Sequence, residues 1–372
     1  MLVDKDFSSG VGAENLLTIH KAFQKGDKFL YTGPVFNRDD GWGFLARFAK
    51  LVFLDVPVAD YTLLLQHEVF GHGARLRSIG LSPSYDLPLP VPYGEGGGAT
   101  YFSGYSISPR DEMGIDTGGV ESTEVLANKL GKKAISKGTL NFQEALLYFG
   151  GHHDQTFYIL GDNGKGTYAS GHDIRSYHSD LTQFLGRETV SYDKLRKYAY
   201  WNYADSMSLL SLYTIWQYMF DAEREQEIPM FSMGGVEFLP GYRLALTPYG
   251  IEHGLNSYLN FQESTGFAYI RFGDNDERNS YAFGFDMNKL WENDDFSYGI
   301  KADFWKQPVV GQSEGLHSKD KIGGALSIRS TYQFAEDYGI FAELGGKTKG
   351  YLLGESLDKD VKLTVGLALL SL

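Results

Sequence analysis

The chain contains no cysteine. Disulfide bonds and thiolate metal ligands are therefore excluded, and any metal site must use His, Asp or Glu side chains. An excess of positive charge is also missing, because 34 Lys and Arg stand against 47 Asp and Glu, a formal net charge of -13. No basic patch stands out to neutralise phosphates, so a nucleic-acid partner is not expected.

Long apolar runs are absent as well. The best candidate, residues 208–220, is interrupted by Ser, Thr and Gln, so a transmembrane helix is not expected. A part that crosses a bilayer would have to be a β-barrel. The start, Met1-Leu2-Val3-Asp4, lacks the basic and apolar regions of a signal peptide. An envelope location would therefore imply a mature chain without its leader.

Apolar residues, glycine and aromatic residues are abundant. Apolar residues make up 42% of the 372 positions, which allows a sizeable core and two domains. The chain holds 45 Gly, 25 Tyr and 25 Phe, a skewed combination. Glycine together with many aromatic residues is typical of outer-membrane strands.

One stretch carries the chemistry: His67-Glu68-Val69-Phe70-Gly71-His72. Burying two imidazoles and a carboxylate costs several kcal/mol unless each finds a partner, and zinc satisfies all three. Histidines at i and i+4, as in the common zinc-protease helix, lie about 40° apart around the axis, whereas i and i+5 puts them about 140° apart. Both can reach one metal only through a π-type bulge, which Gly71 would ease.

This stretch resembles the H-E-x-x-G-H motif of the dipeptidyl peptidase III family of zinc peptidases, in which the one-residue insertion is known. The resemblance implies zinc bound by His67 and His72, with a third ligand from a Glu on a later helix and often an acidic residue four positions beyond it. Glu124 matches that role, although Asn128 stands in place of the acid, and Glu121 is the alternative. Nothing outside these two stretches resembles the family.

Such a zinc site would leave one position open to water and lower the pKa of that water towards 7. Glu68 follows a ligand without being one, so it is the expected general base. A neutral or cationic donor should stabilise the tetrahedral oxyanion. The candidates are His152, His153, Tyr177 and His178.

Residues 1–230 are expected to be mainly helical. The periodicity predicts helices from Trp42 to about residue 52, then at 60–80, 120–130, 141–150, 173–187 and 192–222, with Lys28–Thr32 as a possible strand. Residues 81–118 are rich in Pro and Gly, and a loop of that length is expected to form a pocket wall or lid. Several aromatic residues are expected to pack inside: Trp201, Tyr203, Tyr213, Trp216 and Tyr218.

Past Pro229 the apolar period changes from 3.6 to 2, which predicts strands at 241–248, 253–262, 266–273, 279–287, 295–305, 320–333, 336–346 and 360–371. Short and long connections alternate, as in outer-membrane barrels. The less apolar face carries isolated charges, which suit a polar lumen: Arg243, Lys301, Asp303, Arg329, Glu343 and Lys362. A soluble barrel or sandwich, with its apolar face inward, is the alternative.

The sequence thus predicts an α+β protein with a mainly helical metallohydrolase domain over 1–230. An antiparallel, transmembrane-type β-barrel of about eight strands follows over 231–372, and N-terminal strands could complete it. The expected function is a zinc metallopeptidase of the bacterial outer membrane, acting on a peptide or protein of the envelope, with the lipid bilayer as a second partner. The oligomeric state is not predicted.

Two alternatives to the peptidase stay open. One is a metal-dependent amidase or esterase that acts on lipid or cell wall. The other is a non-enzymatic barrel that a helical domain plugs or gates, with a structural metal. Three protein ligands plus water would mark the enzyme, and four protein ligands the structural site.

Overall fold

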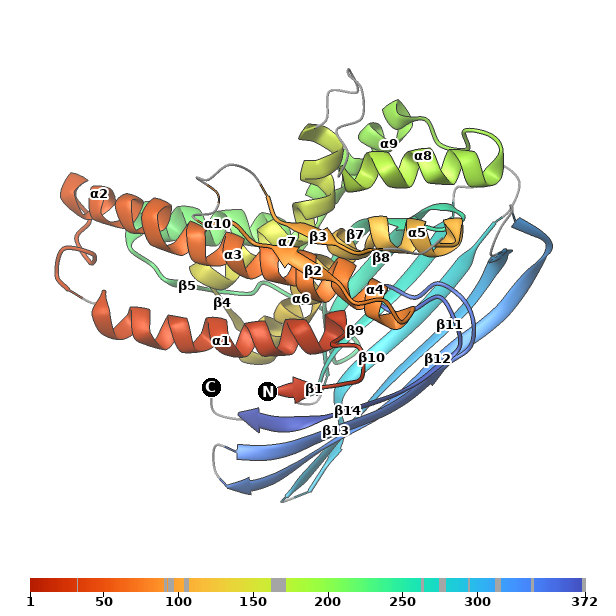
Figure 1. Cartoon of the computed structure of the whole chain (residues 1–372). Helices are drawn as coiled ribbons and strands as arrows, with labels where there is room; N and C mark the ends of the chain where they lie inside the picture. The colour runs from red at the N-terminus through yellow and green to blue at the C-terminus, as the bar shows by residue number, and fades with distance from the viewer. Residues whose placement is uncertain are drawn as a thin grey trace.

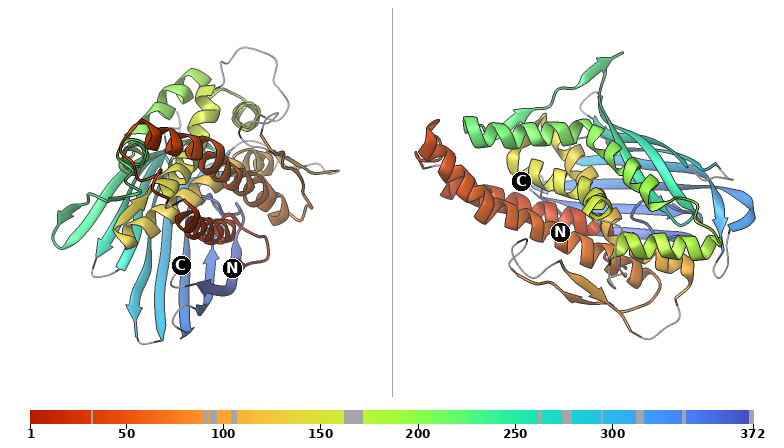
Figure 2. Two further views of the ribbon diagram at one scale, coloured as in Figure 1. Left: turned by 90° about the vertical axis from the view of Figure 1, so that its left-hand side faces the viewer. Right: turned by 90° about the horizontal axis from the view of Figure 1, so that it is seen from above.

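The computed structural model describes residues 1–31, 33–89, 92, 97–103, 107–161, 172–261, 264–273, 279–293, 295–311, 316–335 and 338–369. A layer of helices lies against the concave side of a curved antiparallel sheet (Figure 1). Two further views show the same two layers, with the helices gathered on one side of the strands (Figure 2). The protein is therefore a mixed helix and strand structure, as the sequence predicts.

Eight long strands form most of the sheet, and all eight are predicted from the alternation of apolar residues. They are β7 (Val236–Thr247), β8 (Gly250–Phe261), β9 (Ser264–Gly273), β10 (Tyr281–Glu292), β11 (Phe296–Val310), β12 (Leu316–Ala335), β13 (Tyr338–Lys347) and β14 (Asp360–Leu369). Each pairs with its neighbour in sequence. The short strands β6 (Phe231–Met233) and β1 (Leu2–Val3) add to the two edges.

The predicted closure into a barrel is wrong. The strand order runs β1-β14-β13-β12-β11-β10-β9-β8-β7-β6, and over the described residues the two end strands do not pair. Strand periodicity fixes which face of a strand is apolar, but it does not fix whether the first and last strands meet. Helical side chains instead take up backbone groups of β7, because the Leu244 N–H donates to Asn202 Oδ1 (2.8 Å) and Gln155 Nε2 donates to the Leu244 carbonyl (3.0 Å).

The helical layer has these elements: α1 (Ser9–Leu30), α2 (Gly41–Lys50), the π-helix η1 (Leu51–Asp55), α3 (Val56–His67), the π-helix η2 (Glu68–His72), α4 (Gly73–Ser78), α5 (Pro109–Asp116), α6 (Gly118–Lys137), α7 (Phe142–Gly161), α8 (Asp173–Leu185), α9 (Tyr192–Ala199), the 3-10 helix η3 (Tyr200–Ala204) and α10 (Ser206–Asp221). β2 (Ser84–Asp86) and β3 (Ala99–Tyr101) form a small antiparallel hairpin. β4 (Thr139–Asn141) and β5 (Glu225–Glu227), far apart along the chain, form a separate two-stranded antiparallel sheet.

Several local predictions need correction. The strand expected at Lys28–Thr32 is wrong, since Lys28 to Leu30 end helix α1 and Thr32 lies outside the described residues. The separate helices expected up to about residue 52 and from residue 60 are joined, because α2, η1 and α3 follow one another without a break and Pro57 comes directly after the π-turn of η1. The helix expected at 192–222 is three helices, the last capped by Asp205. Within the expected loop 81–118, the described residues form β2, β3 and α5.

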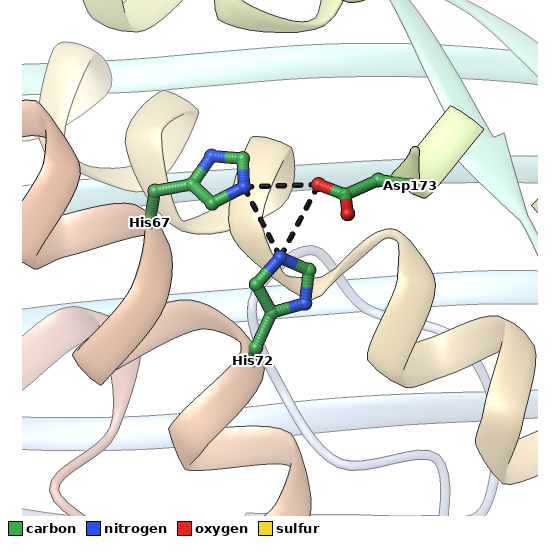
Figure 3. Close-up of side chains that lie close together, drawn as sticks. All are labelled: His67, His72 and Asp173. Carbon is green, nitrogen blue, oxygen red and sulfur yellow. Dashed lines mark hydrogen bonds and ion pairs between the residues drawn. The ribbon is translucent and has the colours of Figure 1, made fainter. Parts of the chain in front are cut away.

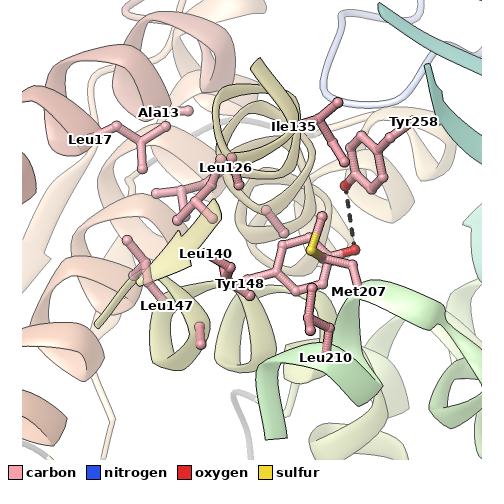
Figure 4. Packing of buried hydrophobic residues seen from close by; sticks show 14 of the residues in the cluster. Ala13, Leu17, Leu126, Ile135, Leu140, Leu147, Tyr148, Met207, Leu210 and Tyr258 are labelled. Carbon is pink, nitrogen blue, oxygen red and sulfur yellow. Dashed lines mark hydrogen bonds between the residues drawn. The ribbon is translucent and has the colours of Figure 1, made fainter. Parts of the chain in front are cut away.

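The main core lies between α1, α6, α7 and α10 (Figure 4). Leu126 and Leu130 of α6 and Tyr148 of α7 are buried in it. Tyr258 of β8 enters the same core, and its hydroxyl lies 3.3 Å from that of Tyr148. The core therefore joins the helical layer to the concave face of the sheet.

The polarity of the sheet is reversed relative to a water-exposed sheet. In β14, Val361, Leu363 and Val365 are exposed on the convex side, while Lys362 and Thr364 point inward. The concave side and the helices enclose a cavity of about 210 Å³, and the predicted lumen charges line it: Arg243, Lys301, Asp303, Arg329, Glu343 and Lys362. Among the described residues, no helix combines the length and apolarity needed to cross a membrane.

Candidate metal centre

The predicted π-type bulge is present. Glu68–His72 form the π-helix η2 between α3 and α4, and the Gly73 N–H donates to the carbonyl of Glu68, five residues back. A β-carbon on Gly71 would meet the backbone of Gly118 and Gly119 at 2.7 Å, so only glycine allows the bulge to approach α6 this closely. Spacing alone therefore predicted this local distortion of the helix.

The bulge brings the two imidazoles together. His67 Nε2 and His72 Nε2 lie 3.1 Å apart. Asp173, the first residue of α8, places Oδ2 2.9 Å from His67 Nε2 and 3.2 Å from His72 Nε2 (Figure 3). Within the described parts of the chain, this is the one group of three or more His, Asp or Glu donors whose ligand atoms lie within 4.8 Å of one another.

The opposite nitrogen of each ring is also held. His67 Nδ1 lies 2.8 Å from Asp154 Oδ2, and Asp154 in turn accepts from the Thr123 hydroxyl at 2.9 Å. His72 Nδ1 donates to the carbonyl of Ile115 at 2.6 Å. In the neutral imidazole such contacts favour the hydrogen on Nδ1 and leave Nε2 available to a metal ion.

Helix α3, which ends at His67, is anchored to its neighbouring helices by the side chain of Gln66. Gln66 is fully buried, and its Nε2 donates to the carbonyl of Ser9 on α1 (3.0 Å) and to that of Ser122 on α6 (2.9 Å). These two bonds connect α3 to both neighbouring helices. The positions of His67 and His72 are therefore set by the core and not by surface contacts.

The three converging groups are electrostatically coupled. Burial alone would lower the pKa of His67, but the carboxylates of Asp154 and Asp173 raise it well above its ordinary value. Burial also favours a lower pKa for His72, but the carboxylate of Asp173 raises that pKa above its ordinary value. The two imidazoles hold the pKa of Asp173 well below its usual range despite its burial. The centre therefore has a carboxylate that favours a cationic partner.

Glu68 is buried beside this group, under the β2–β3 hairpin. The Thr100 hydroxyl of β3 donates to Glu68 Oε2 at 2.6 Å. A β-carbon on Gly98 would come within 2.8 Å of Glu68 Cγ, so the hairpin can lie this close only because position 98 is glycine. This part of the region expected as pocket wall or lid thus covers the glutamate, while residues 90, 91, 93–96 and 104–106 lie outside the described residues.

The third donor differs from the predicted one. Glu124 pairs with Arg243 of β7, and its Oε2 lies 3.0 Å from His152 Nδ1. Glu121 pairs with Arg75 and accepts from the Thr117 hydroxyl (3.1 Å) and the Gly354 N–H (3.3 Å). Neither glutamate belongs to the His67, His72 and Asp173 group.

The geometry of α6 explains this correction. The face of α6 towards the histidines carries Gly119 and Thr123, one turn apart, and a β-carbon on Gly119 would come within 2.2 Å of His67 Nε2. Successive helical residues are turned by about 100° around the axis, so Glu124 points to the side and Glu121 to the far side. Helix α6 does approach the histidines, but it contributes space and not a ligand.

The candidate oxyanion donors lie in other contacts. His153 Nε2 lies 3.1 Å from Ser208 Oγ, and burial lowers the pKa of His153 to about 3. The Tyr177 hydroxyl donates to the carbonyls of Thr247 (2.7 Å) and Gly250 (2.8 Å), and His178 Nε2 donates to the Val190 carbonyl at 2.8 Å. His152 is held by Glu124, as described above. Each of these side chains stabilises the packing of its own helix.

Tyr158 is an aromatic neighbour of the site that sequence reasoning missed. Its ring stacks on His67 with 5.5 Å between ring centroids and contacts His172, the N-cap of α8, at 5.4 Å. His67 on its own would lower the pKa of Tyr158, but burial and the carboxylates of Asp173 and Asp154 raise it above the ordinary value. Tyr158 therefore stays a neutral phenol. It lies one helical turn after Asp154, a spacing that could have identified it.

The donor set suits a small divalent cation. Two imidazole nitrogens and one carboxylate oxygen, each with a hydrogen-bonded or charged neighbour, match the ligands that zinc takes in sites with an open position. Thiolate-binding ions have no partner in a chain without cysteine. The residues present therefore fit a divalent metal ion, and zinc is among the ions that take such ligands.

Comparisons of the chain with protein-family models, with curated proteins and with solved structures give no match. The resemblance to dipeptidyl peptidase III consequently stays a prediction from the motif. The roles of the residues must be argued from the geometry of this site.

Proposed function

We propose that the chain is a zinc-dependent hydrolase, most simply a peptidase, with His67, His72 and Asp173 as the metal ligands. The observation that carries the proposal is the convergence of three donor atoms within 3.2 Å of one another, two from buried histidines on a helix bulge and one from the half-buried Asp173. A zinc ion held there would polarise a carbonyl group and lower the pKa of water towards neutrality.

Glu68 is the proposed general base. The Thr100 hydroxyl occupies Glu68 Oε2, which orients the carboxylate and leaves Oε1 to accept a proton. Glu68 would take that proton from the attacking water and deliver it to the leaving amine. The neutral Tyr158 phenol, stacked against His67, is the proposed donor to the oxyanion that develops on the scissile carbonyl.

Three protein donors favour an enzyme over a structural metal site. A structural zinc site is usually closed by four protein ligands. The described residues bring only three His, Asp or Glu donors together here. The same catalytic groups could also hydrolyse an amide or ester of lipid or cell wall. An activity assay distinguishes these substrates from a peptide.

The proposed location is a lipid bilayer, with the convex face of the sheet against the hydrocarbon. Tyr281, Phe283 and Phe285 of β10 are all about half exposed on this face. The charged side chains lie on the opposite side, where Arg329 and Asp286 pair at 2.6 Å. A polar inside and an apolar outside reverse the order found in water-soluble sheets. An intact chain that is freely soluble without detergent would overturn this location.

Metal analysis of purified variants tests the hydrolase. Wild type should hold one zinc per chain, and Asp173→Ala should lose it. Glu124→Gln, the matched change at the glutamate that the motif suggests, should keep it. His178→Ala serves as a control for the loss of an imidazole elsewhere and should also keep zinc. Stoichiometric zinc in Asp173→Ala would reject this ligand set.

Activity is tested on a mixture of peptides, analysed by mass spectrometry, beside a mixture of phospholipids. Glu68→Gln should retain zinc and lose about 10²- to 10⁴-fold in rate, because only the proton transfer is removed. Cleavage of lipid esters without cleavage of peptides would move the substrate to the alternative class. Hydrolysis by Glu68→Gln at the wild-type rate would reject the base.

A further inference from the structure

Helix α2 carries its charged side chains inside and its large apolar ones outside. Arg47 is 0% exposed and Lys50 6%, whereas Trp42 is 70% exposed, Leu45 53% and Phe48 47%. A helix at a water-covered surface shows the opposite order, with its charges turned to solvent. The polarity of α2 is therefore inverted in the same sense as that of the sheet.

Buried hydrogen bonds hold this orientation. The Arg47 guanidinium donates to the carbonyls of Phe36 (2.9 Å) and Arg38 (2.7 Å), and through Nε to that of Met219 on α10 (3.1 Å). Lys50 Nζ lies 2.7 Å from carboxylate oxygens of both Asp55 and Asp27. Turning α2 to expose Arg47 and Lys50 would break all of these contacts, so the outward aromatic face is a fixed feature of the fold.

Helix α10 repeats the pattern. It has no charged residue from 206 to 220. Its inner side includes small polar residues, among them Ser211 and Thr214, whose hydroxyls bond back to the helix carbonyls. Its outer side is a helical stripe of large apolar residues that are 44–57% exposed: Leu209, Leu212, Tyr213, Trp216 and Phe220. The prediction that Tyr213 and Trp216 pack inside is therefore wrong.

The two helices form one surface at the edge of the sheet. Phe44 of α2 contacts Phe220 of α10 with ring centroids 5.2 Å apart, and Trp216 contacts Phe220 at 4.1 Å. Helix α10 and the preceding η3 contact β7, the last long strand before the β6 edge. The view from above shows α10 leading away from the sheet beside α2 (Figure 2). We call the outward faces of α2 and α10 the helical apolar surface.

We propose that the helical apolar surface contacts the hydrocarbon of a lipid bilayer and continues the lipid-facing surface of the sheet where strands are missing. The inference rests on the proposed membrane location. An open sheet edge cannot face hydrocarbon with free peptide groups, and here Asn202 and Gln155 take up those of Leu244. Helix α10, with 16 residues, is about 24 Å long, close to the apolar band of about 25 Å on membrane barrels.

Lipid accounts for this surface better than a protein partner does. Interfaces between proteins have an apolar centre and a charged or polar rim. Here both charged side chains of α2, Arg47 and Lys50, are directed into the fold and paired there. Exposed charges such as Asp39 and Asp221 lie at the ends of the two helices. The sheet, α2 and α10 all turn polar side chains inward and large apolar side chains outward. Contact with one apolar solvent explains this arrangement in all three.

Tryptophan fluorescence tests the proposal in the full chain. The chain has five tryptophans, so variants that keep one and replace the others by Phe report single positions. In phosphatidylcholine vesicles brominated on the acyl chains, Trp42 and Trp216 should lose at least about half of their emission relative to unbrominated vesicles. Trp305 is 1% exposed. It is the internal control and should lose little.

A tryptophan on the convex face of the sheet tests the membrane location independently of the helical apolar surface. Phe283→Trp, in a chain without other tryptophans, places the probe on the convex face. Quenching at 283 without quenching at 42 and 216 overturns the helical apolar surface and leaves the location intact. Absence of quenching at all three positions overturns both, while the zinc and activity assays remain independent of either result.

A charge placed on the helical apolar surface tests whether that surface binds lipid or a second copy of the chain. Leu212→Glu should lower the partition of the chain into phosphatidylcholine vesicles by at least about tenfold. Tyr200→Glu, a similar change at an exposed position outside the surface, should change it little. If Leu212→Glu instead converts a detergent-solubilised dimer into a monomer and leaves the partition unchanged, the surface binds a second copy and the proposal fails.

Discussion

His67 Nε2 and His72 Nε2 lie 3.1 Å apart although five residues separate the two histidines along the chain. On a regular helix that spacing would turn the side chains about 140° away from each other. The π-helix η2 absorbs the extra residue, and the glycines of α6 leave room for it.

Gly119→Ala should weaken zinc binding by about tenfold or more without changing any ligand. Alanine is normally the better helix former, by about 1 kcal/mol, but here the new β-carbon would lie 2.2 Å from His67 Nε2. Competition with a chelator of known affinity measures the change. Gly26→Ala, inside α1 with no atom within 4 Å of its β-carbon, is the matched control and should leave zinc affinity unchanged. Equal affinities for all three proteins would contradict the close approach of α6.

Asp154→Asn should lower zinc affinity by about 10- to 100-fold, because the carboxylate fixes the His67 ring and raises its basicity. Isothermal calorimetry on the apo protein measures the effect. Asp39→Asn removes an exposed carboxylate far from the histidines along the chain and should have no effect. A loss of the same size in both variants would indicate general electrostatics in place of a specific contact.

Tyr158→Phe should reduce the turnover number by about 10²- to 10³-fold with zinc retained, because only the proposed oxyanion donor is removed. The Michaelis constant should change far less. Tyr203→Phe, which removes the hydroxyl of a ring stacked on His153, should leave the turnover number unchanged. Full activity in Tyr158→Phe would remove this residue from the mechanism.

Asp116→Asn should stabilise the protein at pH 8. Burial, reinforced by Asp180, Asp173 and Glu112, raises the pKa of Asp116 from 3.8 to about 9. The unfolded chain gives up this proton near pH 4 and the folded chain only near pH 9, so the contribution of the group to stability falls as pH rises through that window. Asparagine mimics the protonated acid and removes this loss.

Thermal unfolding of the apo protein in detergent, at pH 5 and pH 8, measures that difference. The midpoint of Asp116→Asn should exceed that of wild type by about 2–8 °C at pH 8, and by much less at pH 5. Asp39→Asn again supplies the control for an exposed acid. An advantage of Asp116→Asn that is larger at pH 5 than at pH 8 would mean that burial has not raised this pKa.

The strands and the metal-bearing helix were predictable because both follow from short-range patterns. Alternation over eight or more residues located all eight long strands, and the i, i+5 spacing predicted the bulge at Gly71. Asp173 was not predictable in the same way, because more than a hundred residues separate it from His67 and no spacing connects them. The direction in which α6 points Glu124 and closure of the sheet are likewise set by tertiary contacts.

Glu121, the alternative to Glu124 as predicted third ligand, has a mechanical role in the structure. It holds Arg75 at the end of the metal-bearing helix and the Gly354 N–H of the segment that joins β13 to β14, and Arg75 also donates to the carbonyl of Glu355. Helix α4 and the two strands are thereby fastened at one point. The helix that follows the histidines therefore cannot move away from the C-terminal strands unless these contacts break, although Arg75 and Glu355 lie 280 residues apart along the chain.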